Sequence, residues 1–165
     1  MIRKYTYGTP FDTEAAALKI EASQGFPDVG EISLADGFSF AYGLKDSDIV
    51  YGLGEANRGI NKRGYKYISD NTDIPNHHED VYSLYGAHNF VIVSGEQTFG
   101  LYIDYPAAVT FDIGYTKYDQ LLITIDSTDL DLYVITGTDP YDITRQFRKM
   151  IGRSYIAPKF AFGFG

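Results

Sequence analysis

Two of the chain's three histidines lie in the segment NHHED, residues 76–80, and the third is His88. Histidines beside carboxylates could bind a metal ion. His77 and His78 are adjacent, however, so on a strand their side chains would point to opposite faces. The chain also lacks the HxxxH and HExxH spacings that bring two histidines to one face of a helix. The pattern therefore favours a solvated loop, and we expect neither a metal site nor a cofactor.

A glycine-rich stretch, YGLGEANRGINKRG at residues 51–64, could bind phosphate. Gly54 and Gly59 have P-loop spacing, but the next two residues are Ile-Asn instead of Lys-Ser or Lys-Thr. The alternative GxGxxG fingerprint fails because Asn57 occupies the third glycine position. The glycines are therefore expected to form turns.

Carboxylates could act as a glycosidase pair, which needs two carboxyl groups about 5 Å apart for a retaining mechanism. Their spacing selects no such pair, and three histidines within a short window do not support a Ser-His-Asp triad. Most of the acidic residues are expected in turns or on solvated strand faces. Those considered are Glu55, Asp70, Asp73, Glu79, Asp80, Asp104, Asp112, Asp126, Asp129 and Asp131.

The elements that must position these residues are mainly strands. Period-2 alternation of apolar residues predicts strands at 38–42, 99–103, 109–113, 121–125 and 130–134. The second and third are expected to form one hairpin around Pro106, and the last two another around the turn DSTD. Strands at this spacing are typical of a β-sandwich.

Two helices are expected at the ends of the sandwich. FDTEAAALKIEASQ, residues 11–24, contains strong helix formers behind a capping-type Asp12 or Thr13. In residues 138–152, Asp139 can cap and Gly152 can end a helix. Its apolar face is expected to contain Ile143, Phe147, Met150 and Ile151.

The C-terminal sequence SYIAPKFAFGFG alternates Phe160, Phe162 and Phe164 with small residues, which predicts a strand with one aromatic face. Such a strand, if exposed at an edge, would readily pair with another chain. We therefore expect more protein to follow and cover it, and the alternative is self-association through residues 158–165.

Composition excludes several classes of protein. The formal charge of −8 argues against binding to nucleic acid or to an anionic membrane. There is no cysteine, and no apolar run approaches the length of a membrane span. No secretory signal follows Met1, so a cytoplasmic location is expected.

Several stretches resemble the N-terminal domain of family 31 glycoside hydrolases, the α-glucosidase family. The family's Gly-x-Gly-Glu turn, Arg-Gly segment and Asn-Thr-Asp loop are matched in order by YGLGE (51–55), NKRGYKY (61–67) and NTD (71–73). Residues 98–114 resemble the family's Gly-aromatic hairpin, and residues 129–165 resemble the join to the catalytic barrel. The resemblance covers about residues 30–165.

This resemblance implies an all-β fold: an antiparallel β-sandwich of the galactose-mutarotase-like supersandwich type, with short flanking helices. Residues 1–152 would form this domain. Residues 153–165 would be a linker and the first strand of a (β/α)8 catalytic barrel that needs about 250 residues more.

The resemblance also implies a role for the polar segment 61–80, as a loop that shapes the sugar pocket at the barrel mouth. Asp73 would bind a substrate hydroxyl, with Asn71 and Thr72 holding the loop. The alternative is that Asn71 and Asp73 only form an Asx-type turn before Pro75. Arg58, Arg63 and the acidic run 76–80 are expected to organise the loop or meet the barrel.

Catalysis in the family uses two carboxylic acids on barrel loops, one within a Trp-x-Asp-Met-Asn-Glu type of motif. This chain contains no such motif and no tryptophan. We therefore expect no catalytic residue in it and no activity from the isolated chain. The full-length enzyme would take an oligosaccharide or α-glucoside, with this domain packed on its own barrel.

Two further interpretations stay open. The first is a stand-alone carbohydrate-binding or mutarotase-like sandwich, with Tyr65, Tyr67, Tyr82 and Tyr85 as stacking platforms. The second is an interaction domain that self-associates through its C-terminal edge.

Overall fold

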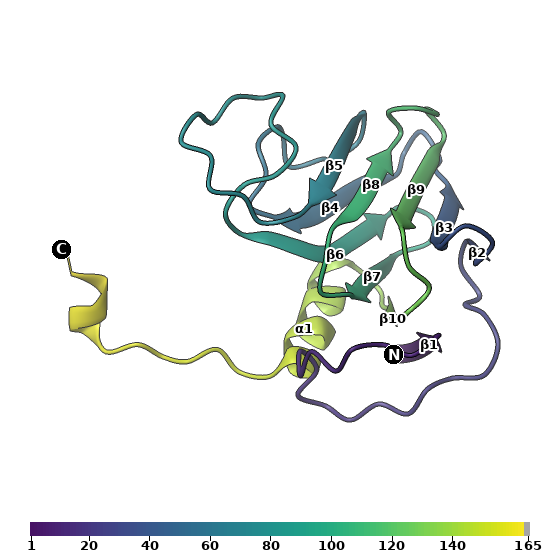
Figure 1. The fold of residues 1–165 in the computed structure, drawn as a ribbon, viewed down its shortest axis with the longest axis horizontal. Coiled ribbons are helices and arrows are strands. Elements are labelled where there is room, and N and C mark those ends of the chain that lie inside the picture. Colours follow the sequence, from purple (N-terminus) through teal and green to yellow (C-terminus); the bar gives the residue numbers. More distant parts are fainter. Residues whose placement is uncertain (164–165) are drawn as a thin grey trace.

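The computed structural model describes residues 1–163, and its ten strands form two antiparallel five-stranded sheets packed face to face (Figure 1). The first sheet contains, in spatial order, β1 (Ile2–Tyr7), β10 (Leu130–Thr136), β7 (Phe99–Asp104), β6 (Ala87–Ser94) and β4 (Ile49–Gly54). The second contains β2 (Glu31–Ser33), β3 (Phe38–Gly43), β9 (Gln120–Ile125), β8 (Val109–Ile113) and β5 (Tyr65–Ser69). The expected antiparallel sandwich is confirmed.

The main core lies between the sheets and follows the alternation of the strands. On β7, Leu101 and Ile103 are fully buried, while Tyr102 between them is only half-buried. Phe111 of β8 and Ile123 of β9 fill the facing side. Burial of such side chains is the main force that stabilises the sandwich.

The strands predicted to form hairpins lie in different sheets. β7 belongs to the first sheet, whereas β8, which follows it, pairs with β9 and β5 in the second. In the same way β9 lies in the second sheet and β10 in the first. Both hairpin predictions are therefore wrong, including the hairpin that the family resemblance implied. A hairpin and a connection between sheets show the same alternation, so the pattern could not distinguish them.

The helix predicted over 138–152 is confirmed as α1, Pro140–Ile151. The Asp139 carboxylate caps it by accepting a hydrogen bond from Asp142 N at 2.9 Å. Gly152 ends it with a φ of 91°, in the left-handed region that favours glycine.

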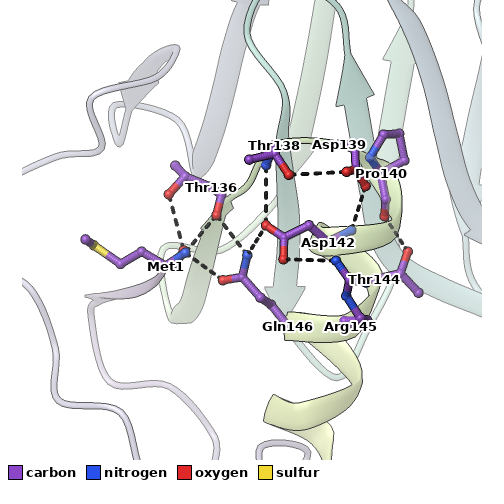
Figure 2. A network of polar contacts seen from close by, with 9 residues as sticks. All are labelled: Met1, Thr136, Thr138, Asp139, Pro140, Asp142, Thr144, Arg145 and Gln146. Atoms are coloured by element: carbon purple, nitrogen blue, oxygen red, sulfur yellow. Dashed lines mark hydrogen bonds and ion pairs between the residues drawn. The ribbon is translucent and has the colours of Figure 1, made fainter.

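A polar network ties the start of α1 to the N-terminus of the chain (Figure 2). The ammonium group of Met1 donates to the Thr136 carbonyl at 2.7 Å and to Gln146 Oε1 at 2.6 Å. Gln146 Nε2 donates to the same carbonyl at 3.0 Å. The network joins β1, β10 and α1.

The apolar face of α1 packs on the outer face of the first sheet. Ile143 and Met150 are fully buried, and Phe147 stacks on Phe90 of β6 with the ring centroids 3.9 Å apart. Ile151 is 40% exposed, so the face is narrower than its spacing predicted.

Residues 11–24 do not form the predicted helix; they run as an extended strap across the first sheet. Three donors of the strap bond to other elements: Thr13 Oγ1 to Asp104 at 2.6 Å, Leu18 N to Met150 O at 3.0 Å, and Ser23 N to Lys4 O at 2.7 Å. These tertiary bonds replace the bonds within a helix, and they outweigh the weak preference of the alanine-rich sequence. The predicted helix at this end is therefore wrong.

The C-terminal segment leaves the sandwich (Figure 1). Lys159–Phe162 form a 3-10 helix where a strand was predicted, and Phe160 and Phe162 are 84% and 79% exposed. No strand among residues 1–163 lies beside this segment, and a strand needs such a neighbour for its hydrogen bonds. Phe164 lies outside the described residues. The domain boundary at 152 and self-association through 158–165 stay predictions.

None of the helices in residues 1–163 has the length and apolar character needed to span a membrane.

Candidate functional site

The polar segment 61–80 is not one loop. Tyr65–Ser69 form β5, which pairs with β8 from Tyr65 opposite Ile113 to Ser69 opposite Val109. The long connection runs instead from residue 70 to residue 86, between β5 and β6, and we call it the crossing loop because it joins the second sheet to the first. In Figure 1 it projects beyond the sheets as the teal loop beside β5.

The two ends of the crossing loop, residues 70–72 and 82–86, form its base and are bonded to each other and to β6. The contacts are Asn71 Oδ1 accepting from Ala87 N at 2.8 Å, Thr72 N donating to Leu84 O at 3.0 Å, and Thr72 Oγ1 donating to Ser83 O at 3.1 Å. The Ser83 hydroxyl also donates to the Asp70 carbonyl. Asn71 and Thr72 therefore hold the loop at its base.

Asp73 is the first residue of the tip, residues 73–81. Its side chain is exposed, and within residues 1–163 no hydrogen bond or ion pair engages its carboxylate. Asn71 uses its side-chain oxygen on Ala87, across the base, instead of on a local Asx turn. The structure thus presents a free carboxylate directly after two anchoring residues.

The histidines of the tip make contacts with their neighbours. His77 lies edge-on to Tyr85 with the ring centroids 5.5 Å apart, and His78 Nδ1 pairs with the Asp80 carboxylate. This hydrogen bond lowers the pKa of Asp80. No group of three or more histidine, cysteine or acidic residues is placed to hold a metal ion in the part of the chain that the structure describes.

Arg58 lies at the centre of a tyrosine cluster beside the loop. Its guanidinium is 4.1 Å from the ring centroid of Tyr65, 5.2 Å from that of Tyr67 and 5.9 Å from that of Tyr82. Its Nε also donates to the Glu79 carbonyl at 2.6 Å. This agrees with the expectation that Arg58 organises the loop.

Arg63 also has a structural role, but at a different place, where it joins the turn at residues 45–48 to the turn around Tyr118. It donates to the Asp48 carbonyl at 3.2 Å and to the Tyr118 carbonyl at 3.3 Å, and it also bonds the Lys45 carbonyl. Its guanidinium lies 5.0 Å from the Tyr118 ring centroid. These contacts hold two turns together and leave it no part in the crossing loop.

The glycines of YGLGE allow the backbone to approach β6 closely. A Cβ on Gly52 would lie 2.2 Å from the Phe90 carbonyl oxygen, and one on Gly54 would lie 2.3 Å from that of Gly86. Glu55 then accepts a hydrogen bond from Gly86 N at 3.0 Å and so holds the end of the crossing loop. Gly52 and Gly54 lie within β4, with a bulge in the pairing to β6 between them, so the turn expected at these two glycines is wrong. Gly64 does lie in a turn, just before β5.

A groove of about 330 Å³ lies at the base of the loop. Its polar lining includes Asp70, Asn71, His88, Asn89, Tyr102 and Tyr105. Burial raises the pKa of Tyr102, so its hydroxyl stays protonated and can donate a hydrogen bond. These groups could bind a small molecule that carries several hydroxyls.

A second group of carboxylates lies under the strap. Asp104 and Asp131 are directly opposite in the register of β7 and β10, and Asp131 pairs with Lys4 Nζ at 2.7 Å. Burial raises the pKa of Asp104. The Thr13 and Thr6 hydroxyls bond these two carboxylates at 2.6 Å each, which indicates a structural role.

The sequence did not predict the carboxylate cluster of Asp104 and Asp131 or the tyrosines around Arg58. Asp104 and Asp131 gave one local signal, since each is a polar residue within an apolar strand pattern. For Arg58 the sequence predicted a role in the loop but not its aromatic contacts.

Comparison with known proteins gives a family match. The family model of the glycosyl hydrolase 31 N-terminal galactose mutarotase-like domain matches residues 12–112. The match begins in the strap, before the resemblance expected from about residue 30, and it ends before the expected join at residues 129–165. The match covers more than half of the chain.

Curated relatives include larger enzymes. The chain is 30% identical over 123 residues to alpha-glucosidase 2 of Bacillus thermoamyloliquefaciens, covering 73% of this chain and 16% of that protein. It is 24% identical to the alpha-glucosidase of Saccharolobus solfataricus, covering 99% of this chain and 24% of the relative. The chain thus spans about a quarter or less of the length of these relatives.

A solved structure with the same fold is the GH31 dextranase of Flavobacterium johnsoniae complexed with glucose. The TM-score is 0.72 at 24% identity, over 84% of this chain and 17% of that one. At this identity the likeness establishes the fold alone.

Proposed function

Because the chain belongs to the glycosyl hydrolase 31 N-terminal galactose mutarotase-like domain family, we propose that it is the N-terminal domain of a retaining α-glucosidase-type glycoside hydrolase. The alpha-glucosidase relatives support this, since the chain spans 16% and 24% of their lengths. In the proposal the reacting carboxylates belong to a (β/α)8 barrel outside this chain. The sandwich packs on that barrel and contributes one wall of the substrate pocket.

The crossing loop is the part of this chain that meets the substrate, an oligosaccharide or short α-glucoside. The observation that carries this role is the exposed Asp73 carboxylate, which follows the anchors Asn71 and Thr72 directly. A carboxylate accepts charge-assisted hydrogen bonds from sugar hydroxyls. Asp73 therefore orients the sugar, while the barrel performs the reaction.

The test is Asp73→Ala in the full-length enzyme, with kcat/KM measured on maltose and on an aryl α-glucoside. Loss of one hydrogen bond to a charged group corresponds to a decrease of about 10- to 150-fold. Asp126→Ala, at an exposed turn, is the matched control. Unchanged kcat/KM in Asp73→Ala would refute the role of the loop, and cleavage by the isolated 165-residue chain would refute the assignment of catalysis to the barrel.

A stand-alone carbohydrate-binding domain is the second candidate. Tyr82 and Tyr85 beside the tip are 48% and 46% exposed and could stack on a sugar ring. Tyr67 is buried, and Arg58 covers one face of Tyr65, so these two are poor platforms. Saturable binding of glucose or maltose to the isolated chain, measured by calorimetry, would favour this candidate.

A further inference from the structure

The tip of the crossing loop has few bonds of its own. Its Val81 amide donates to the His78 carbonyl at 3.1 Å, and the Tyr85 hydroxyl reaches the Ile74 carbonyl at 3.3 Å. The base, by contrast, is bonded on both sides by backbone and side chains. The tip therefore depends on contacts from elsewhere to keep one conformation.

Those contacts come from two adjacent residues of a different turn. Asn57 Nδ2 donates to the His78 carbonyl at 2.7 Å, and Arg58 Nε donates to the Glu79 carbonyl at 2.6 Å. Arg58 also donates through NH1 to the Lys66 carbonyl of β5 at 3.3 Å. One guanidinium thus joins the tip to a strand of the second sheet.

The backbone at Arg58 is held in an unusual conformation. Its φ is 76°, in the left-handed region that costs energy for a residue with a side chain. Such strain persists only where surrounding contacts fix it, and here the contacts are the two carbonyls and the face of Tyr65.

The chemistry of these contacts requires arginine. A planar guanidinium can donate to two carbonyls within its plane while its face lies on an aromatic ring, and a lysine ammonium cannot do both. Among residues 1–163 no carboxylate forms an ion pair with Arg58, so its bonds are directed at backbone and rings.

We propose that Arg58 is a positioning residue, which holds the tip through the Glu79 carbonyl and so fixes where Asp73 presents its carboxylate. Arg58 touches no substrate and acts through the loop. The claim that Arg58 positions Asp73 for the sugar rests on the proposed function, whereas the claim that Arg58 holds the tip does not.

The first experiment measures amide hydrogen exchange in the 165-residue chain for Arg58→Gln and Arg58→Lys. In Arg58→Gln the Val81 amide is expected to exchange about tenfold faster, with a smaller increase in Arg58→Lys. Amides of β7 should be unchanged, which separates loosening of the tip from global unfolding.

A second variant keeps the result decisive if Arg58→Gln does not fold. Asn57→Ala removes only the bond to the His78 carbonyl and should also speed exchange in the tip. Unchanged exchange at Val81 in the folded variants would overturn the proposal.

The second experiment is a double-mutant cycle in the full-length enzyme. Arg58→Gln is expected to lower kcat/KM about tenfold, mainly through KM, with partial rescue in Arg58→Lys. In the Asp73→Ala background Arg58→Gln should have no further effect, because both act through one contact. If the losses of kcat/KM in the two single variants multiply in the double variant, the link between Arg58 and Asp73 is wrong. If Asp73→Ala alone has no effect, the proposed function fails, while the exchange data still decide whether Arg58 holds the tip.

Discussion

The sandwich core and the crossing loop are stabilised by different interactions. In the core, fully buried side chains such as Leu101 and Phe111 pack between two sheets. In the loop, an exposed tip is held by hydrogen bonds to carbonyls and by a guanidinium lying on tyrosine rings. The comparison indicates that the stability of the fold and the geometry of the site can be changed separately.

The largest effect is expected in the core. Leu101→Ala should lower the free energy of unfolding by about 2–5 kcal/mol, because it leaves a cavity between the sheets. Asp73→Ala, at the exposed tip, should change it by no more than about 0.5 kcal/mol. Urea denaturation of both variants measures this difference, and similar losses in the two would contradict the separation of core and loop.

A smaller effect of the same kind is expected under α1. Met150→Ala should cost about 2 kcal/mol, at the low end of the range for such changes, because Met150 is fully buried but lies outside the main core, beside the strap. The neighbouring Ile151→Ala should cost less than about 0.5 kcal/mol, since Ile151 is partly exposed. Thermal unfolding of the pair checks this, and equal costs would show that burial does not separate the two positions.

Within the crossing loop, a substitution at the base should lower the free energy of unfolding more than one at the tip. Asn71→Ala removes the bond to Ala87 N and should cost about 1 kcal/mol. Asn76→Ala, the matched change at the exposed tip, should be close to neutral. The measurements are denaturant unfolding and hydrogen exchange of the Ala87 amide. If the Ala87 amide exchanges as slowly in Asn71→Ala as in the wild type, the anchoring role is wrong.

The smallest effect is expected in the pH dependence of stability, through the Asp104 carboxylate beneath the strap. Burial raises the pKa of Asp104 in the folded state, so folding is favoured while Asp104 is protonated, and this contribution is lost as pH rises through the raised pKa. Asp104→Asn removes the titration and keeps an oxygen for the Thr13 hydroxyl.

The Tm of Asp104→Asn relative to wild type should therefore be higher at pH 7 than at pH 3, and exposed Asp126→Asn serves as the control. Asp131 and Lys4 also face Asp104, and both remain in the variant. The same Tm difference at both pH values would show that Asp104 does not titrate in this way.

Much of the local structure was predictable from the sequence. Alternation located the strands at 38–42 and 121–125, and Asp139 and Gly152 marked the ends of α1. These signals succeed because each depends on residues within one or two turns of the chain. Asp73 was predicted from the family's Asn-Thr-Asp sequence, and its role with substrate stays a proposal.

The predictions that failed concern which distant partners a segment binds. The composition of the strap predicted a helix, but its Ser23 and Leu18 amides bond to the carbonyls of Lys4 and Met150 instead. The contacts of Arg58 were not predicted because Tyr65 lies in the next strand, β5, and Glu79 lies beyond that strand in the crossing loop.

The sequence by itself located β3, β7, β8, β9 and β10, and it determined where α1 begins and ends, because these follow from local propensity and periodicity. Tertiary structure alone decided which sheet each strand joins, that the segment 11–24 lies extended, and that Arg58 reaches the tip of the crossing loop. The physical reason is that strand pairing and the contacts of polar side chains are selected by packing between segments far apart in the chain, which no local pattern encodes.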